Sequence, residues 1–326
     1  MHRRLLAVLL SILAAPLSAV AQQAPKVVTI GWLNPTTPAA TAHLLEGLLQ
    51  GLRDHGYVEG KTFVLERRYA EGKVEQLPQL ASDLVRRKVD VIVTATDIAI
   101  SAAKQQTRTI PIVMANSTDP LGTGLVASLA RPGGNVTGLT SISPQLSGKR
   151  LELLKDVVPK LSRVAFLWNP EIRGAVLDYQ QTEGAARSLG LKLQSIEATR
   201  VEHLDSAFAA ITEQRAQALI VASPNPITFT NRARIINFVQ SNRLASVYAS
   251  SEYVDAGGLM AYGPNGVDLF RRAATFVVKV VNGANPAELP VEQPAKFELV
   301  INLRAAKALG LTIPHALLLR ADHVIQ

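Results

Sequence analysis

Small polar and acidic side chains follow many of the short apolar runs of this 326-residue sequence. Hydroxyl, amide and carboxylate groups can hold a small ligand by hydrogen bonds, but the same residue types also cap the helices that begin there. Taken alone, each residue has the simpler interpretation of a helix cap, whereas the whole set predicts a binding cleft. The candidate ligand-binding residues are Asn34, Thr36, Thr37, Thr96, Asp97, Asn116, Ser117, Asp119, Asn169, Ser223 and Glu252. The same apolar runs are also followed by Thr118, Asn225, Ser250, Ser251 and Tyr253.

The acids and hydroxyls in this set suit different parts of a ligand. Asp119 and Glu252 are the acids that could pair with an ammonium group. Thr96, Ser117 and Ser223 could donate hydroxyl hydrogen bonds to a carboxylate. Helix starts add free backbone N–H groups, which favour an anion. The helix starts therefore favour a ligand that carries a carboxylate.

Motifs for nucleotide binding or nucleophilic catalysis are incomplete. Residues 122–127 fit the G-x-G-x-x-G/A dinucleotide fingerprint, but that motif needs a strand directly before it and an acidic residue about 20 positions later. Residues 115–121 intervene here, and no acid follows at the right distance, so a glycine-rich start of a helix is the better interpretation. Gly148-Lys149 is not a P-loop, and the sequence lacks the G-x-S-x-G nucleophile elbow.

Metal and thiol chemistry are also unsupported. The chain contains no cysteine, which excludes disulfides, thiolate metal sites and a cysteine nucleophile. Its six histidines have no paired ligand spacing. We therefore expect no metal, no cofactor and no catalytic residue. A secreted α/β enzyme is an alternative that would need a nucleophile or an acid–base pair.

The elements that must position the candidate residues are alternating strands and helices. Leu45, Leu48, Leu49 and Leu52 recur at i, i+3, i+4 and i+7, which predicts the buried face of one helix. Repeated strand–helix units of this length require parallel sheets with right-handed crossovers. The predicted strands are residues 27–33, 62–68, 90–94, 110–114, 136–140, 163–168, 192–196, 218–222, 245–249, 258–262 and 297–303.

The strand pattern restarts near residue 163, which predicts two similar lobes. The expected fold class is α/β, with two doubly wound parallel-sheet lobes joined by a three-crossing hinge near Ser141, Ser251 and Pro290. Ligands of open α/β sheets bind beyond the carboxyl ends of the strands, so the candidate residues of both lobes should meet at one cleft. The expected divisions are a signal peptide at 1–21, a first lobe at 22–141 plus 252–290, and a second lobe at 142–251 plus 291–326.

The N-terminus has the three parts of a secretory signal peptide. They are the basic start His2-Arg3-Arg4, the apolar run 5–17 and the small-residue end Ala19-Val20-Ala21. Cleavage after Ala21, with no cysteine to carry a lipid, predicts a periplasmic location without an anchor. The net charge is +8, but the basic residues are scattered and aromatic residues make up only 5% of the chain. Without a stacking platform, we expect no nucleic-acid partner.

Three stretches of the sequence are distinctive: residues 119–138, residues 257–263, and a C-terminal block made of 297–303, 306–314 and 320–322. They resemble the substrate-binding proteins of ABC transporters that are related to tryptophan and other aromatic amino-acid binding proteins. The resemblance spans essentially the whole chain after the signal peptide. It implies the fold of a type I periplasmic binding protein, a periplasmic location and a small ligand.

The resemblance also implies a function. The expected protein is a monomer that captures a small zwitterion or carboxylate, such as an amino acid and in particular an aromatic one. It would deliver this ligand to an ABC permease in the inner membrane and would not be an enzyme. Closure of the hinge would bury the ligand between the lobes. A periplasmic sensing subunit that presents its ligand to a receptor is the alternative within the same fold.

Overall fold

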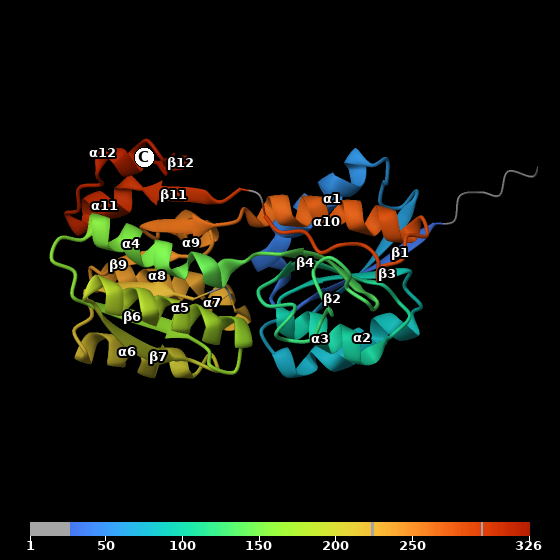
Figure 1. The fold of residues 1–326 in the computed structure, drawn as a ribbon, viewed down its shortest axis with the longest axis horizontal. Helices are drawn as coiled ribbons and strands as arrows, with labels where there is room; N and C mark the ends of the chain where they lie inside the picture. Colours follow the sequence, from blue (N-terminus) through green and yellow to red (C-terminus); the bar gives the residue numbers. More distant parts are fainter. Residues whose placement is uncertain (1–26, 223–224, 295) are drawn as a thin grey trace, which may run out of the picture.

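The structure is a computed structural model that describes residues 27–222, 225–294 and 296–326. Two α/β lobes lie side by side along the longest axis of the molecule (Figure 1). The predicted signal peptide, residues 1–21, lies outside the described residues. In the part of the chain that is described, no helix is long and apolar enough to cross a membrane.

The first lobe is built on a parallel sheet with the strand order β2-β1-β3-β4-β5. Its strands are β1 (Val28–Asn34), β2 (Phe63–Tyr69), β3 (Val91–Ala95), β4 (Ile112–Ser117) and β5 (Val136–Thr140). All of β3 and β5 is buried. Burial on both faces is typical of parallel strands that are covered by helices on each side, and it explains the continuous apolar runs in the sequence.

Helices cover both faces of this sheet. One face holds α1 (Pro38–Asp54) and α10 (Gly266–Val281), and the other holds α2 (Leu77–Arg86) with its leading turn η1 (Val74–Gln76) and α3 (Asp97–Gln106). Although far apart in sequence, α1 and α10 lie alongside each other (Figure 1). Glycine makes this approach possible, because a Cβ atom on Gly51 would lie 2.2 Å from the carbonyl oxygen of Arg271.

The second lobe has the strand order β12-β11-β10-β9-β8-β6-β7. Its strands are β6 (Arg163–Trp168), β7 (Lys192–Glu197), β8 (Ala218–Val221), β9 (Ala245–Tyr248), β10 (Met260–Gly263), β11 (Glu298–Asn302) and β12 (His323–Ile325). The pair β10–β11 is antiparallel and the other neighbours are parallel. The fold class is therefore as predicted, with one antiparallel pair where the chain returns to this lobe.

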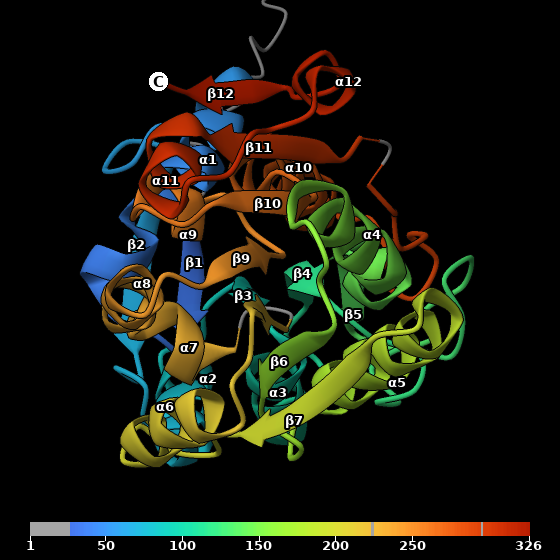
Figure 2. The same ribbon diagram turned by 90° about the vertical axis from the view of Figure 1, so that its left-hand side faces the viewer.

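Helices also cover both faces of the second sheet. The helices are α4 (Ser147–Val157), α5 (Arg173–Leu189), α6 (His203–Glu213), α7 (Pro226–Thr230), α8 (Arg232–Ser241), α9 (Glu252–Asp255), α11 (Leu303–Leu309) and α12 (His315–Leu318), with a 3-10 turn η2 (Ser143–Leu146) before α4. Figure 2 shows α4 and α5 on one side of the sheet and α6 and α8 on the other. A separate buried apolar cluster fills each side.

The structure corrects the predicted boundary between the lobes. The sequence assigns residues 252–290 to the first lobe, but β10 pairs with Val247 and Tyr248 of β9 in the second sheet. The second crossing therefore follows Gly263, and α10 is the element that returns to the first lobe. The third crossing also comes later than Pro290, because the backbone of Glu292 still bonds to β5. The apolar pattern of a short strand such as β10 does not indicate which of two sheets it will join.

Candidate functional site

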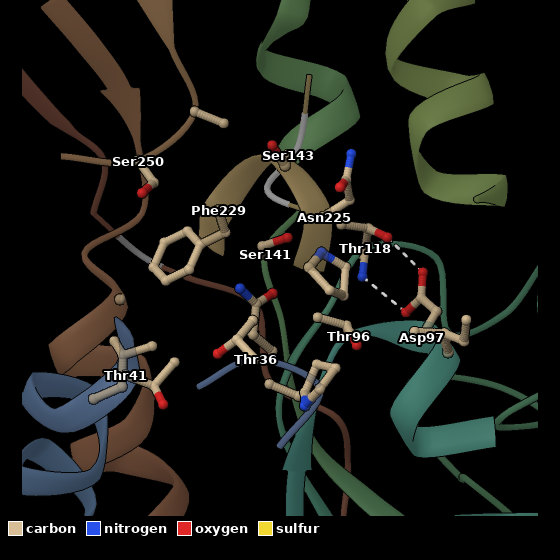
Figure 3. Close-up of a pocket in the computed structure, with 18 of the residues that line it drawn as sticks. Thr36, Thr41, Thr96, Asp97, Thr118, Ser141, Ser143, Asn225, Phe229 and Ser250 are labelled. Carbon is tan, nitrogen blue, oxygen red and sulfur yellow. Dashed lines mark hydrogen bonds between the residues drawn. The ribbon is translucent and has the colours of Figure 1, made fainter. Parts of the chain in front are cut away.

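A cavity of about 120 Å³ lies between the two lobes, beyond the carboxyl ends of their strands. This is the position at which open α/β sheets bind ligands. Figure 3 shows Thr36, Thr41 and Thr96 of the first lobe on the side of the cavity opposite Phe229 and Ser250 of the second. Both lobes thus contribute side chains to one site, so opening the hinge would separate its two halves.

Six of the residues predicted from the sequence line this cavity. They are Asn34, Thr36, Thr96, Asp97, Asn116 and Glu252. Ser223 lies outside the described residues. Three neighbours at the same strand ends, Thr118, Asn225 and Ser250, also line the cavity, as do Thr41, Ser141, Ser143 and the ring of Phe229. The strand-end pattern could have indicated Asn225 and Ser250, whereas no sequence signal distinguished Phe229 from a core residue.

Thr37, Ser117 and Asn169 are not among the residues that line the cavity. Thr37 is the N-cap of α1, and its Oγ1 accepts a hydrogen bond from the backbone N–H of Ala40 at 3.3 Å. Asn169 accepts from the N–H of Glu171 at 2.9 Å in the turn after β6. Ser117 is fully buried and donates its hydroxyl to Asp97. These three polar side chains are therefore hydrogen-bonded to backbone or side-chain groups of the protein.

Asp97 lines the cavity, but its carboxylate is already occupied. Oδ1 accepts from the hydroxyl of Ser117 and from the N–H of Thr118 at 3.0 Å. Oδ2 accepts from the hydroxyl of Thr118 and from the N–H of Asp119 at 3.2 Å. Figure 3 shows the two bonds to Thr118. The carboxylate therefore fixes the loop after β4 at the floor of the cavity, and its lone pairs are used by the protein.

Thr96 has an unusual backbone for a β-branched residue. Its φ of 71° and ψ of 138° lie in a region that favours glycine. Thr96 precedes α3 as its N-cap, yet its side chain makes no capping bond. Among the described residues its buried Oγ1 has no hydrogen-bond partner. Strained backbone of this kind concentrates at binding sites, and Thr96 is one of the residues that line the cavity.

Two amides in the cavity wall are also incompletely bonded. Asn116 lies near the carboxyl end of β4, and its buried Oδ1 lacks a partner among the described residues. Asn225 precedes α7, and its buried Nδ2 likewise lacks one. An unpaired buried polar group costs about 1–3 kcal/mol. Such groups in a cavity wall mark positions where a ligand or ordered water completes the bonding.

Glu252 has partners from both lobes. Its Oε1 lies 2.9 Å from Nε2 of His43 on α1, and its Oε2 accepts from the hydroxyl of Ser250. Burial acts to raise the pKa of Glu252, but the hydrogen bonds from His43 and Ser250 outweigh it and hold that pKa below its ordinary value. Glu252 is therefore an ionised acid at neutral pH, and it joins α9 of the second lobe to α1 of the first.

Asp119 is not among the residues that line the cavity, and it makes a second contact between the lobes. Its Oδ2 accepts from Nε of Arg173 at 2.7 Å, and Arg173 begins α5 in the second lobe. Its Oδ1 accepts from the N–H of Gly122 at 2.8 Å. The lobes are close together here, because a Cβ atom on Gly174 would lie 2.1 Å from Oγ1 of Thr118. The structure thus has a closed arrangement of the two lobes.

Buried Arg150 connects two of the crossings between the lobes. Its side chain is 1% exposed. The guanidinium donates to the hydroxyl of Ser143 at 2.8 Å and to the carbonyl of Tyr262 at 2.7 Å. Burial lowers the pKa of Arg150, and the carboxylate of Asp178, 3.5 Å away, opposes that change. These bonds hold the first crossing against the end of β10.

The charges in the cavity wall are acidic. Among the described residues that line it, Asp97 and Glu252 are the charged ones, and none is Lys, Arg or His. The described part of the chain also holds no group of three or more His, Asp or Glu side chains that could bind a metal ion. The wall therefore offers hydroxyls, amides, apolar surface and negative charge.

A family model described as ABC transporter substrate binding protein matches residues 35–325. The chain belongs to this family. The family resemblance predicted from the three sequence stretches is thus confirmed, and residues 119–138, 257–263 and 297–322 all lie within the matched range.

Similar proteins, two of them with solved structures, support the fold. A conserved domain protein from Vibrio cholerae O1 biovar El Tor is 30% identical, with a TM-score of 0.86 over 92% of this chain and 100% of that one. An ABC domain from Streptococcus pneumonia, solved in complex with L-Trp, is 25% identical with a TM-score of 0.86 over the same shares. A protein from Clostridioides difficile named tyrosine-binding protein is 27% identical, over 82% of this chain and 76% of its own. The predicted type I periplasmic binding protein fold is therefore confirmed.

Proposed function

We propose that this protein captures an amino acid, in particular an aromatic one, and delivers it to an ABC permease. The observation that carries this proposal is the cavity between the two lobes, which are joined by a hinge. Two side-chain contacts also connect the lobes: His43 with Glu252, and Arg173 with Asp119. A ligand that contacts both lobes binds the closed state better than the open one, and this difference in affinity drives closure. The closed state would then be the form that the permease recognises.

The composition of the cavity wall supports an amino-acid ligand. The rings of Phe229 and Phe270 offer an apolar surface, while hydroxyl and amide groups lie on the same wall. Ligand sites commonly combine an apolar lining with a few placed polar groups. The volume of about 120 Å³ restricts the occupant to a small molecule. The relatives named for tyrosine and solved with L-Trp make aromatic amino acids the first candidates.

We propose binding without catalysis. A general acid or base needs a side chain that is free to exchange a proton with a substrate. Asp97 is held by four donors within the described residues, and Glu252 is held by His43 and Ser250. The acids of the cavity wall thus have structural partners. A turnover assay that detects consumption of the bound ligand would contradict this part of the proposal.

We also propose that the protein acts as a periplasmic monomer without a nucleic-acid partner. The signal-peptide pattern that ends at Ala21 supports export, and the absence of cysteine leaves no site for a lipid anchor. The scattered basic residues and few aromatics give no surface for nucleic acid. N-terminal sequencing of protein from a periplasmic extract should begin at Gln22. A product that still begins at Met1 would contradict the proposed export.

The ligand assignment can be tested by two measurements on freshly purified protein. Native mass spectrometry should detect a co-purified small molecule of the mass of an amino acid. Isothermal titration calorimetry with the twenty amino acids should then give tightest binding for an aromatic one. Binding of several non-aromatic amino acids with equal affinity would contradict the aromatic preference. Binding of none of them would contradict the ligand class.

A further inference from the structure

Asn225 holds a fixed orientation at the cavity wall. It is 3% exposed and is the N-cap of α7, where its Oδ1 accepts from the backbone N–H of Thr228 at 2.9 Å. A backbone N–H can only donate, so the side-chain atom that it meets must be the amide oxygen. The capping bond therefore fixes the other atom of the amide as the NH2 group. The hydrogen bond from Thr228 thus identifies which terminal atom of the Asn225 side chain is nitrogen.

That NH2 group has no hydrogen-bond partner within residues 27–222, 225–294 and 296–326. Nδ2 of Asn225 is buried and lacks a hydrogen bond among the described residues, although Asn225 lines the cavity. Because NH2 only donates, the group that satisfies it must be an acceptor. An oxygen of a ligand in the cavity meets this requirement. The capping role alone does not account for Asn225, since a serine would cap equally well without burying an unpaired amide.

The charges around the cavity limit how a ligand carboxylate can be bound. None of the described lining residues is a cation. Arg173, the cation at the start of α5, is paired with Asp119 at 2.7 Å. A carboxylate in this cavity would therefore be held by neutral donors. The hydroxyl of Thr96 in the first lobe and the amide of Asn225 in the second are donors that have no partner in the described part of the chain.

We propose that Nδ2 of Asn225 donates a hydrogen bond to the carboxylate of the ligand and thereby determines specificity for the free acid. This inference rests on the proposed function, in which the ligand is an amino acid. The second lobe then binds the carboxylate end through a neutral amide, and this bond forms only when the lobes meet. A ligand whose carboxylate is removed or neutralised loses part of the contact that favours closure.

The substitution Asn225→Asp tests this assignment because it keeps the shape of the side chain and its capping oxygen. Aspartate caps helices as well as asparagine does, so the bond from Thr228 is kept. The donor NH2 is replaced by an acceptor that carries negative charge. The probes are L-tyrosine or L-tryptophan, whichever binds the unmodified protein more tightly, and the corresponding amino-acid amide. The amide ligand can donate to the new carboxylate, whereas the free acid is repelled by it.

Calorimetry should show that Asn225→Asp weakens binding of the free acid by about tenfold to a hundredfold, the range for a hydrogen bond to a charged group. Binding of the amide should weaken less, so the preference for acid over amide falls or reverses. The matched control is Asn302→Asp. Asn302 caps α11 in the same lobe by accepting from Ala305 at 3.1 Å, is 5% exposed and lies away from this cavity. Its variant should keep the acid-to-amide ratio of the unmodified protein.

The outcomes separate this inference from the proposed function. If the unmodified protein binds the acid and Asn225→Asp keeps the same acid-to-amide ratio, the inference is overturned and the proposed function stands. If the unmodified protein binds neither probe, the proposed preference for an aromatic amino acid is wrong and the inference falls with it. Thermal unfolding establishes that each variant is folded. Should Asn225→Asp fail to fold, Asn225→Ser supplies a second test, because it keeps a capping oxygen, removes the amide donor without adding charge, and should weaken binding of the free acid more than binding of the amide.

Discussion

The strained backbone of Thr96 predicts that glycine is more stabilising than alanine at this position, which is the reverse of the usual order. Replacing glycine with alanine commonly stabilises a protein by about 0.4–1 kcal/mol, because alanine has less freedom in the unfolded chain. At φ 71° this order should reverse. A non-glycine residue held in a rarely populated region stores about 1–3 kcal/mol, which glycine does not. We therefore expect Thr96→Gly to be more stable than Thr96→Ala by about 1 kcal/mol or more.

Ligand binding at the same site should depend instead on whether the side chain has a hydroxyl. Thr96→Ser keeps a hydroxyl on the cavity wall, whereas Thr96→Ala and Thr96→Gly remove it. The loss of one hydrogen bond of about 0.5–1.5 kcal/mol corresponds to roughly 2- to 13-fold weaker binding. Thr96→Gly should thus be stabilised and yet bind less tightly. That combination is expected where a strained residue serves function.

Guanidinium unfolding of the ligand-free protein measures the stability of the variants. Ligand must be absent because binding to the folded state adds its own stabilisation. Fluorescence can report the lobes separately, since Trp32 lies in β1 of the first lobe and Trp168 in β6 of the second. Because Thr96 lies in the first lobe, its variants are followed by the fluorescence of Trp32. The substitution Trp168→Phe removes the signal of the second lobe. Equal stability of Thr96→Ala and Thr96→Gly would refute the backbone strain, and equally tight binding by Thr96→Ala and Thr96→Ser would refute the hydroxyl contact.

Asp119→Asn removes a half-exposed ion pair with Arg173 that is worth about 0–1 kcal/mol. The affinity for the ligand should therefore fall less than about fivefold, and small-angle scattering of the ligand-free protein should show a larger radius of gyration. If neither the affinity nor the radius of gyration changes, this ion pair does not hold the lobes closed. Burial acts to raise the pKa of Glu252, but its hydrogen bonds hold the pKa below 4.5. Stability from this carboxylate is present above its unfolded pKa and is lost as pH falls through the lower folded value. Glu252→Gln should therefore flatten the acid limb of stability measured against pH, and an unaltered limb would contradict the assignment. Gly51→Ala would place a Cβ atom 2.2 Å from the carbonyl of Arg271 and should destabilise the first lobe by about 1–3 kcal/mol in denaturant unfolding, whereas a neutral effect would show that α1 and α10 can separate.

The sequence alone determined the α/β class and the two-lobed arrangement. Strands such as Val91–Ala95 are apolar on both faces, and that pattern is stable only with helices on each side. The long helices were readable from their apolar stripes, because 3.6-residue periodicity is a local property. The strand-end rule likewise predicted a cleft between the lobes, and six of the predicted residues lie in the wall of the cavity there.

The tertiary structure decided which strand-end groups are free. Asp97 and Asn225 look alike in the sequence, since each is a polar residue at the start of a helix. In the fold, donors from residues 117–119 occupy both oxygens of Asp97, while the NH2 group of Asn225 has no partner among the described residues. Asp119 meets Arg173 of the other lobe. Helix caps and ligand contacts use the same residue types, so only the three-dimensional positions of donors and acceptors distinguish them.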